Sequence, residues 1–192
     1  MTGSRRFSQA VSEGDGISIV AVVDGLDSAR RAEAEGAEAV LVGSGREGGL
    51  GEIRDGISLP ILFYWDGQDA DRFWGADACV LDATGDNGLE HAHSALGEDF
   101  ELALRVEDEE QLARTLERFD PELFVLGTTD EEEALDRVLE LLPDVPAGKL
   151  AIADVPATTR DQVLELERAG VDAVIVRAGN VAELVGGAPP EV

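Results

Sequence analysis

The chain has 192 residues, 44% of them hydrophobic, and its 41 acidic side chains outnumber the 15 basic ones to give a formal net charge of −26. This length predicts a single domain with one core, and this charge repels nucleic acid and acidic membrane surfaces, so we exclude both as partners. The first residues contain no apolar leader and no later segment approaches the roughly 20 apolar residues of a membrane span, so we expect a cytoplasmic protein.

Eight short apolar runs of β type follow one another along the chain. Their near-continuous apolar character is typical of parallel strands that are covered on both faces. The expected strands are residues 17–24, 39–43, 61–65, 78–82, 101–106, 123–127, 150–154 and 173–177.

Segments with helix signals lie between these runs. The segment "DSARRAEAEG" ends at Gly36, and glycine commonly follows the last residue of a helix. The segment "EDEEQLARTLERF" has acidic residues in its first turn and Arg in its last, and "TTRDQVLELERAG" begins with Thr and stops at Gly170. The sequence therefore predicts a strand followed by a helix, repeated along the whole chain.

One such unit recurs as "GAEAVLV", "GADACVL" and "GVDAVIV", each with a helix stop, an acidic residue, a small residue and a strand. Eight units are the content of a (β/α)8 barrel, although 192 residues fall just under its usual lower size of about 200. The competing open sheet usually has about five or six strands and a G-x-G-x-x-G turn, which "VVDGLDSA" lacks. We therefore predict an α/β fold, a minimal single-domain (β/α)8 TIM barrel.

The domain boundaries follow from this pattern. We expect residues 1–16 to form an N-terminal extension or short helix that plugs the barrel bottom, 17–186 to form the barrel, and 187–192 to be a flexible tail. The single cysteine, Cys79, lies in an apolar run, which excludes a disulfide within the chain and predicts a buried, inert thiol.

Three stretches match the sequence patterns of a known family. The stretch "LPILFYWDGQDADRFWGADACVLDA" is similar to P-V-L-R-K-D-F, a short helix and G-A-D-A-V-L-L, and "LALRVEDEEQL" is similar to L-V-E-V-H-D-E-E-E-L. The stretch "LAIADVPATTRDQVLELERAGVDAVIVRAGN" is similar to S-E-S-G-I-x-T-x-E-D-V followed by L-x-x-A-G-V-D-A-V-L-V-G. These patterns belong to strands three to five, seven and eight of indole-3-glycerol phosphate synthase, a ribulose-phosphate-binding TIM barrel. The resemblance covers most of residues 17–182.

The resemblance implies where that family's catalytic residues fall, and most of them are changed. The third-strand Lys, a general acid, falls at Tyr64, and the fifth-strand catalytic Glu falls at Arg105, a reversal of charge. The seventh-strand Glu falls at Asp154, a partial match, and the eighth-strand Gly beside the phosphate becomes Arg177. The family closes the ring of a carboxyphenylamino sugar phosphate by decarboxylation and dehydration, which needs an acid. The chain's lysine, Lys149, precedes the seventh strand and is expected at the opposite face.

The active site of such a barrel lies at the C-terminal ends of its strands, which we refer to as the barrel mouth. In a functional interpretation, Arg105 and Arg177 hold a carboxylate or phosphate. Tyr64 and Trp65 then stack a ring and Asp154 acts as a base, which makes Asp154, Tyr64 and Arg105 the catalytic candidates. In the alternative, which we favour because no motif supports the first, aspartates only pair with the arginines in a solvated network. The residues expected at the mouth are Asp24, Gly43 or Ser44, Tyr64 or Trp65, Asp82, Arg105, Thr128, Asp154 and Arg177.

An anionic ligand would bind after the last two strands, where the family binds its phosphate. Val155 and Pro156 replace the family's Ser-Gly and offer one backbone N–H fewer, whereas Gly179 is retained and Asn180 is suited to cap a short helix. The candidate ligand-binding residues are Arg177, Gly179, Asn180 and Thr128.

No metal or cofactor is predicted. His91 and His93 are two apart on an expected helix, so they face different directions and indicate a solvated pair. The aspartates that end strands one, four and seven are expected too far apart to share a cation.

The sequence therefore leads to a hypothesis and an alternative. The leading hypothesis is a barrel of the indole-3-glycerol phosphate synthase type that is catalytically degenerate and binds a small phosphorylated or carboxylated metabolite at its mouth. The alternative is an enzyme, either a divergent synthase or a related phosphosugar lyase or isomerase. A third option is a homo-oligomeric scaffold, and we expect a monomer or small homo-oligomer. The sequence leaves open whether the acidity is an adaptation to salt.

Overall fold

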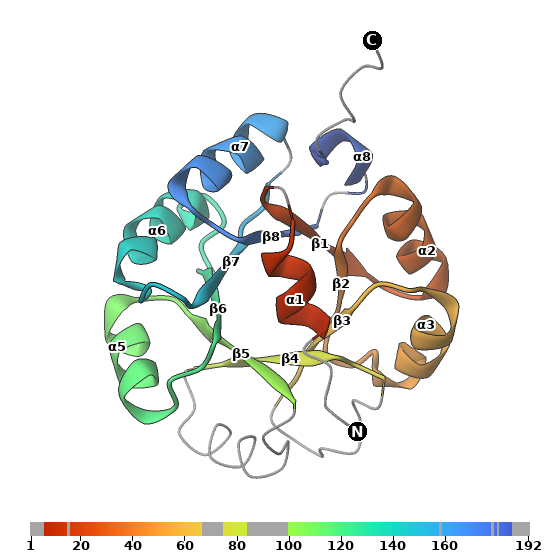
Figure 1. Ribbon diagram of the computed structural model, residues 1–192, viewed down its shortest axis with the longest axis horizontal. Helices are drawn as coiled ribbons and strands as arrows, with labels where there is room; N and C mark the ends of the chain where they lie inside the picture. Colours follow the sequence, from red (N-terminus) through yellow and green to blue (C-terminus); the bar gives the residue numbers. More distant parts are fainter. Residues whose placement is uncertain are drawn as a thin grey trace.

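A computed structural model describes residues 6–14, 16–66, 75–83, 100–157, 159–177, 179 and 181–185. Its strands form one closed parallel barrel in which each strand pairs with its neighbours in chain order (Figure 1). The strands are β1 (Ser18–Val23), β2 (Ala39–Val42), β3 (Ile61–Tyr64), β4 (Ala78–Asp82), β5 (Glu101–Val106), β6 (Leu123–Gly127), β7 (Leu150–Asp154) and β8 (Ala173–Val176). The predicted TIM barrel is confirmed, and each expected strand is found to within a residue at either end.

Helices surround the barrel as an outer ring (Figure 1). None of the helices within the described ranges is long and apolar enough to cross a membrane. The helices of this ring are α2 (Leu26–Glu35), α3 (Leu50–Gly56), α5 (Glu109–Arg118), α6 (Ala134–Leu141), α7 (Arg160–Ala169) and α8 (Val181–Leu184), with 3-10 turns η1 (Glu47–Gly49) and η3 (Leu142–Asp144). A further helix, α1 (Arg6–Ser12), lies outside the ring, at one end of the barrel.

The helix ends follow the sequence signals. Gly36 and Gly170 end α2 and α7 with φ of 97° and 99°, a left-handed conformation that favours glycine. At the other end of α7, the Thr159 hydroxyl accepts from the Gln162 N–H, and the Gln162 side chain accepts from the Thr159 N–H. The Asp108 carboxylate caps α5 by accepting from the backbone N–H of Gln111 at 2.8 Å.

Two apolar cores hold the fold together. The larger core lies between the strands and the helices and contains Cys79, which is fully buried as predicted, and burial raises the pKa of its thiol. The smaller core fills the barrel itself. Its buried members are Phe7, Val11, Val20, Ala39, Leu41, Leu62, Ala78, Val80, Ala103, Leu123, Val125, Ile152, Ala173 and Ile175.

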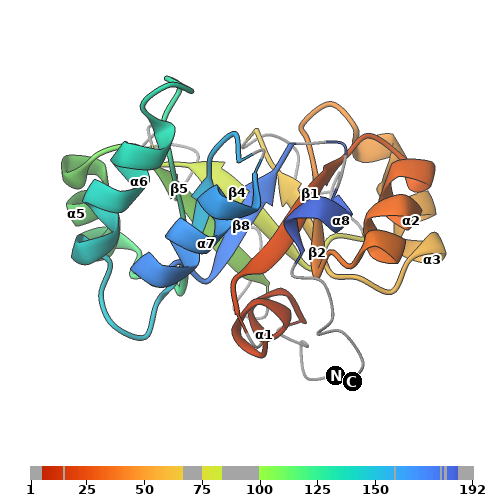
Figure 2. The same cartoon turned by 90° about the horizontal axis from the view of Figure 1, so that it is seen from above.

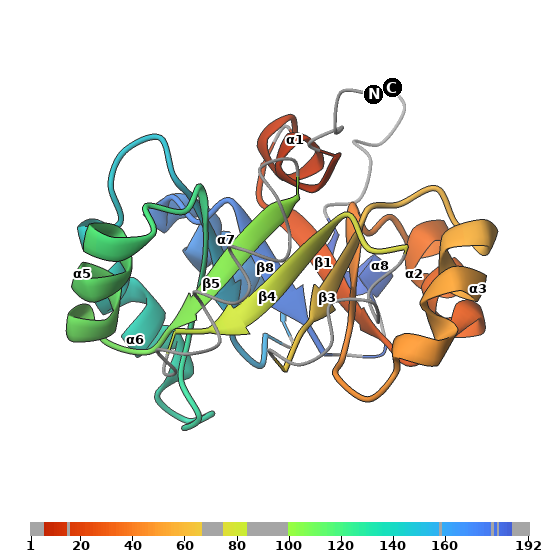
Figure 3. The same cartoon turned by 90° about the horizontal axis from the view of Figure 1, so that it is seen from below.

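Helix α1 closes the bottom of the barrel. Figures 2 and 3 show it at the end of the barrel opposite to the strand arrowheads. Phe7 and Val11 reach from this helix into the interior core, where Phe7 has no exposed surface. The Glu101 carboxylate, at the start of β5, accepts the backbone N–H groups of Phe7 and Ser8 at 2.9 Å each. The helix is therefore fixed to the barrel by both apolar packing and hydrogen bonds.

The acidic residue of the repeated unit has a structural role at the same end of the barrel. In each copy it lies two residues after a glycine of positive φ, donates its backbone N–H to the start of the preceding odd-numbered strand, and accepts an N–H from the same strand residue through its carboxylate. These bonds satisfy the first polar groups of the strand. The pairs are Glu38 with Ile19 (3.1 and 2.8 Å), Asp77 with Ile61 (2.8 and 2.8 Å) and Asp172 with Ala151 (2.9 and 2.7 Å).

Candidate functional site

A ring of polar side chains lies at the barrel mouth. Alternate residues of a barrel strand point inward, so the position two residues after the last apolar interior residue faces the mouth. Contacts between the side chains of these positions confirm that they meet there. They are Tyr64 on β3, Asp82 on β4, Arg105 on β5, Asp154 on β7 and Arg177 directly after β8.

Arg105 is the centre of this ring. Its Nη1 lies 2.5 Å from Oε1 of Glu107 and 3.4 Å from Oδ1 of Asp82, and its Nε donates to Oδ2 of Asp154 at 3.4 Å. The guanidinium is mostly buried, with 10% of the side chain exposed. Burial disfavours its charge, but the hydrogen bond to Glu107 and the charges around it outweigh burial and raise the pKa of Arg105. Arg105 is therefore a fixed positive charge that three carboxylates share.

Tyr64 extends this network on the β3 side. Its hydroxyl donates to Oδ1 of Asp82 at 2.6 Å, the same oxygen that lies near Arg105. Burial and the hydrogen bond to Asp82 raise the pKa of Tyr64 well above its usual value. The phenol therefore keeps its proton at neutral pH and acts as a hydrogen-bond donor.

Gly127 on β6 gives Arg105 room to reach β7. A Cβ at this position would lie 3.0 Å from both Cβ and the carbonyl oxygen of Asp154, and 3.5 Å from Nη2 of Arg105. The backbone of Asp154 cannot give way as a flexible side chain can. The absence of a side chain at Gly127 is therefore a condition for the contact between Arg105 and Asp154.

Asp154 and Arg177 form the other end of the ring. Oδ1 of Asp154 lies 2.8 Å from Nη2 of Arg177, and 7% of the Asp154 side chain is exposed compared with 49% of the Arg177 side chain. Despite this ion pair, Oδ1 has no hydrogen bond of acceptable geometry and is itself buried. The ion pair therefore joins a buried acid to a half-exposed base.

The other sequence candidates lie outside this network. The Thr128 hydroxyl accepts from the backbone N–H of Asp130 at 3.2 Å in a local turn. Gly179 is exposed, with nothing within 4 Å of a Cβ built on it, and Asn180 falls outside the described residues, as do His91 and His93. The structure thus brings together Asp154, Tyr64, Arg105 and Arg177, and their roles remain predictions.

Two members of the site were missed from the sequence. Alternation along β5 places Ala103 and Arg105 on the inner side of the barrel. Glu107 lies two residues after Arg105, so the same alternation, continued past the end of β5, predicts that Glu107 also faces the mouth. Gly127 was not among the residues that the sequence indicated for the mouth. No local signal marks its role, because the contact it permits joins β5 to β7.

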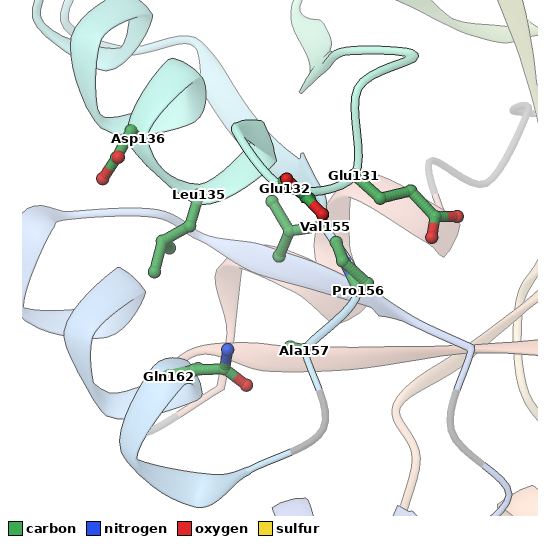
Figure 4. Close-up of a pocket in the computed structure, with 8 residues that line it drawn as sticks. All are labelled: Glu131, Glu132, Leu135, Asp136, Val155, Pro156, Ala157 and Gln162. Atoms are coloured by element: carbon green, nitrogen blue, oxygen red, sulfur yellow. The ribbon is translucent and has the colours of Figure 1, made fainter.

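A separate cavity of about 260 Å³ lies beside the mouth, between the start of α6 and the loop before α7 (Figure 4). Leu135 of α6 lies on one side of it and Gln162 of α7 on the other (Figure 4). Within the described ranges, no group of three His, Cys, Asp or Glu side chains is arranged to hold a metal ion. The lining residues are Glu131, Glu132, Leu135, Asp136, Val155, Pro156, Ala157 and Gln162.

Comparison with known proteins supports the sequence resemblance. No family model matches the chain. The chain is 31% identical over 140 residues to indole-3-glycerol phosphate synthase of Albidiferax ferrireducens, and the match covers 66% of this chain and 52% of that protein. The chain thus spans about half the length of the curated relative that it matches.

Solved structures are similar in fold at low sequence identity. Oxaloacetate acetylhydrolase matches with a TM-score of 0.69 and 13% identity over 94% of this chain and 82% of that one. Thiamine phosphate pyrophosphorylase from Pyrococcus furiosus matches with a TM-score of 0.68 and 14% identity over 88% of this chain and 93% of that one. A putative phosphonomutase from Burkholderia cenocepacia matches with a TM-score of 0.68 and 16% identity over 92% of each chain. These similarities establish the barrel fold and do not extend to an activity.

Proposed function

We propose that the protein is a catalytically degenerate relative of indole-3-glycerol phosphate synthase that binds a small carboxylated or phosphorylated metabolite at its barrel mouth. The observation that carries this proposal is the position of Arg105. The resemblance assigns a catalytic Glu to this position, and here it holds a buried guanidinium between Asp82, Glu107 and Asp154. Such a group neither accepts nor releases a proton near neutral pH.

The residue at the family's general-acid position supports the same proposal. Tyr64 stands where the resemblance assigns a Lys, and its raised pKa together with its hydrogen bond to Asp82 opposes release of its proton. Ring closure with loss of water needs a donor that protonates a carbonyl and a leaving hydroxyl. A phenol whose proton is already held by a carboxylate is a poor donor for these steps.

Arg177 supports binding of an anion. It lies directly after β8, where the family has a Gly beside the phosphate, and its side chain is half-exposed. Its ion pair with Asp154 involves Nη2, so the guanidinium has further N–H groups that can bind a ligand. Guanidinium groups bind carboxylates and phosphates well because their planar N–H donors match both anions. Pro156 removes one backbone N–H from the neighbouring loop, so the side chain of Arg177 carries more of the binding.

A combined activity and binding experiment tests the proposal. The purified protein, at high concentration and beside an authentic synthase, is assayed by fluorescence for formation of indole-3-glycerol phosphate from the carboxyphenylamino deoxyribulose phosphate. We expect no turnover. Calorimetric titration with the same substrate, inorganic phosphate and acetate should detect binding that Arg177→Gln weakens and Arg168→Gln, on the exposed surface of α7, leaves unchanged. Turnover that copurifies with the protein would contradict the proposal.

A second candidate is a divergent synthase or a related phosphosugar lyase or isomerase, with Asp154 as base and Tyr64 or Arg105 as partner. It is favoured by the 31% identity to the Albidiferax ferrireducens protein and by the buried carboxylate of Asp154, which lies at the family's seventh-strand position. Turnover that Asp154→Asn abolishes, in a protein that remains folded, would establish this candidate in place of the first.

A further inference from the structure

Asp154 has an unused hydrogen-bond acceptor in the middle of the candidate site. Among the described residues, its Oδ1 is the buried side-chain oxygen without a hydrogen-bond partner. Buried carboxylate oxygens normally accept hydrogen bonds because an unmatched one loses its solvation without compensation. The other oxygen, Oδ2, is occupied by Nε of Arg105. The carboxylate is thus held in place on one side and lacks a donor on the other.

The neighbour of this oxygen is a side chain that can move. Nη2 of Arg177 is 2.8 Å away, but its geometry gives an ion pair and no hydrogen bond, and half of the Arg177 side chain is exposed. A ligand with an anionic group can draw the guanidinium toward itself by a change of rotamer. That movement gives the ligand access to Oδ1.

We propose that Asp154 and Arg177 together bind a small α-amino acid, whose ammonium group donates to Oδ1 of Asp154 and whose carboxylate accepts from Arg177. This inference deepens the proposed function and rests on it, because it names the class of carboxylated metabolite that the mouth binds. The ammonium and carboxylate of an α-amino acid are joined through a single carbon. They can therefore reach an acid and a base that lie within hydrogen-bonding distance of each other.

The charge of the site favours an amino acid over a simple anion. The network contains the carboxylates of Asp82, Glu107 and Asp154 and the guanidinium groups of Arg105 and Arg177, so it is already negative by one charge. A phosphate dianion would increase this excess in a protein whose net charge is −26. An amino acid leaves it unchanged, and its ammonium supplies the donor that Oδ1 lacks.

The same end of the barrel also offers apolar surface for a side chain. Val22 is 39% exposed and follows the interior residue Val20 by two positions on β1, which places it on the inner face at the mouth. Tyr64 is half-buried on β3. An apolar or aromatic side chain on the ligand would remove this surface from water.

Two matched series of compounds test the inference on the unmodified protein by calorimetric titration. The first is L-alanine, L-lactate, propionate and ethylamine, and the second is L-phenylalanine, L-phenyllactate, phenylpropionate and phenethylamine, with inorganic phosphate as a further probe. Within a series, the compounds differ in the ammonium, hydroxyl or carboxylate alone. We expect the amino acid of at least one series to bind about tenfold or more tightly than its hydroxy acid, simple acid and amine, the usual effect of a hydrogen bond to a charged group.

The outcomes separate this inference from the proposed function. If simple acids or phosphate bind as well as the amino acids, the anion site stands and the amino acid inference fails. If only the amines bind, both fail, and the absence of binding by every probe also contradicts both. Asp154→Asn and Arg177→Gln should each weaken amino acid binding about tenfold or more. The control variants Asp161→Asn and Arg168→Gln, exposed on α7, should not.

Discussion

At the scale of single residues, the mouth depends on how one guanidinium is shared. Arg105 contacts carboxylates from three places, the end of β4, the segment after β5 and the end of β7. A buried charge is tolerated only where partners compensate the loss of water. The same contacts that make Arg105 a poor catalyst thus make it important for the shape of the mouth.

Replacing Arg105 should therefore cost stability. In Arg105→Met the methylene packing is largely kept, but three carboxylates lose their shared counter-ion, and we expect the free energy of unfolding to fall by about 2–4 kcal/mol at pH 7. Urea denaturation followed by circular dichroism measures this loss.

A surface arginine provides the matched control for this change. Arg137 on α6 pairs with Glu140 at 3.2 Å, and 35% of its side chain is exposed. Arg137→Met should change the free energy of unfolding by less than about 1 kcal/mol, because exposed ion pairs contribute little. Equal losses in both variants would show that Arg105 has no special role.

Gly127 should not tolerate a side chain. In Gly127→Ala the new methyl group would press on the backbone of Asp154, 3.0 Å away, and we expect a loss of about 1–3 kcal/mol in the free energy of unfolding. Gly43, directly after β2 at the same end of the barrel, has nothing within 4 Å of a built Cβ. Gly43→Ala is therefore the control, and thermal unfolding of both variants should separate them. A neutral Gly127→Ala would mean that β6 and β7 can separate freely.

At the scale of elements, the acidic residue of the repeated unit makes the same hydrogen bond in each copy, but its electrostatic surroundings differ between copies. The acid before β2, β4 and β8 accepts an N–H from the preceding strand. Asp77 also forms ion pairs with Arg54 and Arg6, whereas burial raises the pKa of Asp172. The same hydrogen bond is thus made by a compensated charge at Asp77 and by a carboxylate whose charge burial disfavours at Asp172.

Asparagine substitutions at Asp172 and Asp77 should affect the free energy of unfolding differently. Because the folded-state pKa of Asp172 is raised above 3.8, the charged form costs stability above that pKa, and the cost disappears as pH falls below 3.8. Asp172→Asn keeps an acceptor oxygen and removes the charge, so it should leave the free energy of unfolding at pH 7 unchanged or raise it by up to about 1 kcal/mol.

Asp77→Asn serves as the contrasting variant. It removes the charge that faces Arg54 and Arg6, and we expect it to lower the free energy of unfolding at pH 7 by about 1–3 kcal/mol. Urea denaturation of both variants between about pH 3 and pH 8 measures the two changes in the free energy of unfolding. A destabilised Asp172→Asn, or a neutral Asp77→Asn, would contradict this account of the repeat.

Helix α1 should contribute to global stability although it precedes the first strand. Phe7 has no exposed surface and belongs to the core inside the barrel. Phe7→Ala should therefore lower the free energy of unfolding by about 3–5 kcal/mol, the usual effect of removing a buried aromatic ring. Gln9→Ala, on the exposed side of the same helix, is the control and should be nearly neutral. If Phe7→Ala is equally mild, α1 is only loosely attached to the barrel.

At the scale of the whole molecule, the sequence predicts the scaffold far better than the site. Apolar runs locate the strands because a parallel barrel buries both faces of each one, and Gly36, Gly170 and Thr159 mark helix ends through local backbone chemistry. Alternation along single strands also places Arg105 and Asp154 at the mouth. The role of Gly127 and the Asp154 Oδ1 that lacks a hydrogen bond could not be predicted, because they depend on side-chain distances between different strands.

The net charge is a property of the whole molecule, and it should make folding depend on salt. With a formal charge of −26, the folded chain holds its acidic groups closer together than the unfolded chain does, so their repulsion opposes folding. Salt shortens the screening length from about 10 Å at 0.1 M to about 3 Å at 1 M. We therefore expect the thermal midpoint of unfolding to rise by several degrees between low and molar NaCl, and equally in KCl, because screening depends on ionic strength.

Removing surface charge should reproduce the effect of salt. Asp55, Glu117 and Glu165 are exposed on α3, α5 and α7, and the combined variant Asp55→Asn, Glu117→Gln, Glu165→Gln lowers the negative charge by three without touching the mouth. Its thermal midpoint should exceed that of the unmodified protein at low salt, and the two should converge near molar salt. A midpoint that salt leaves unchanged in both proteins would mean that the acidic side chains are spaced widely enough not to repel one another. The acidity would then have no bearing on folding.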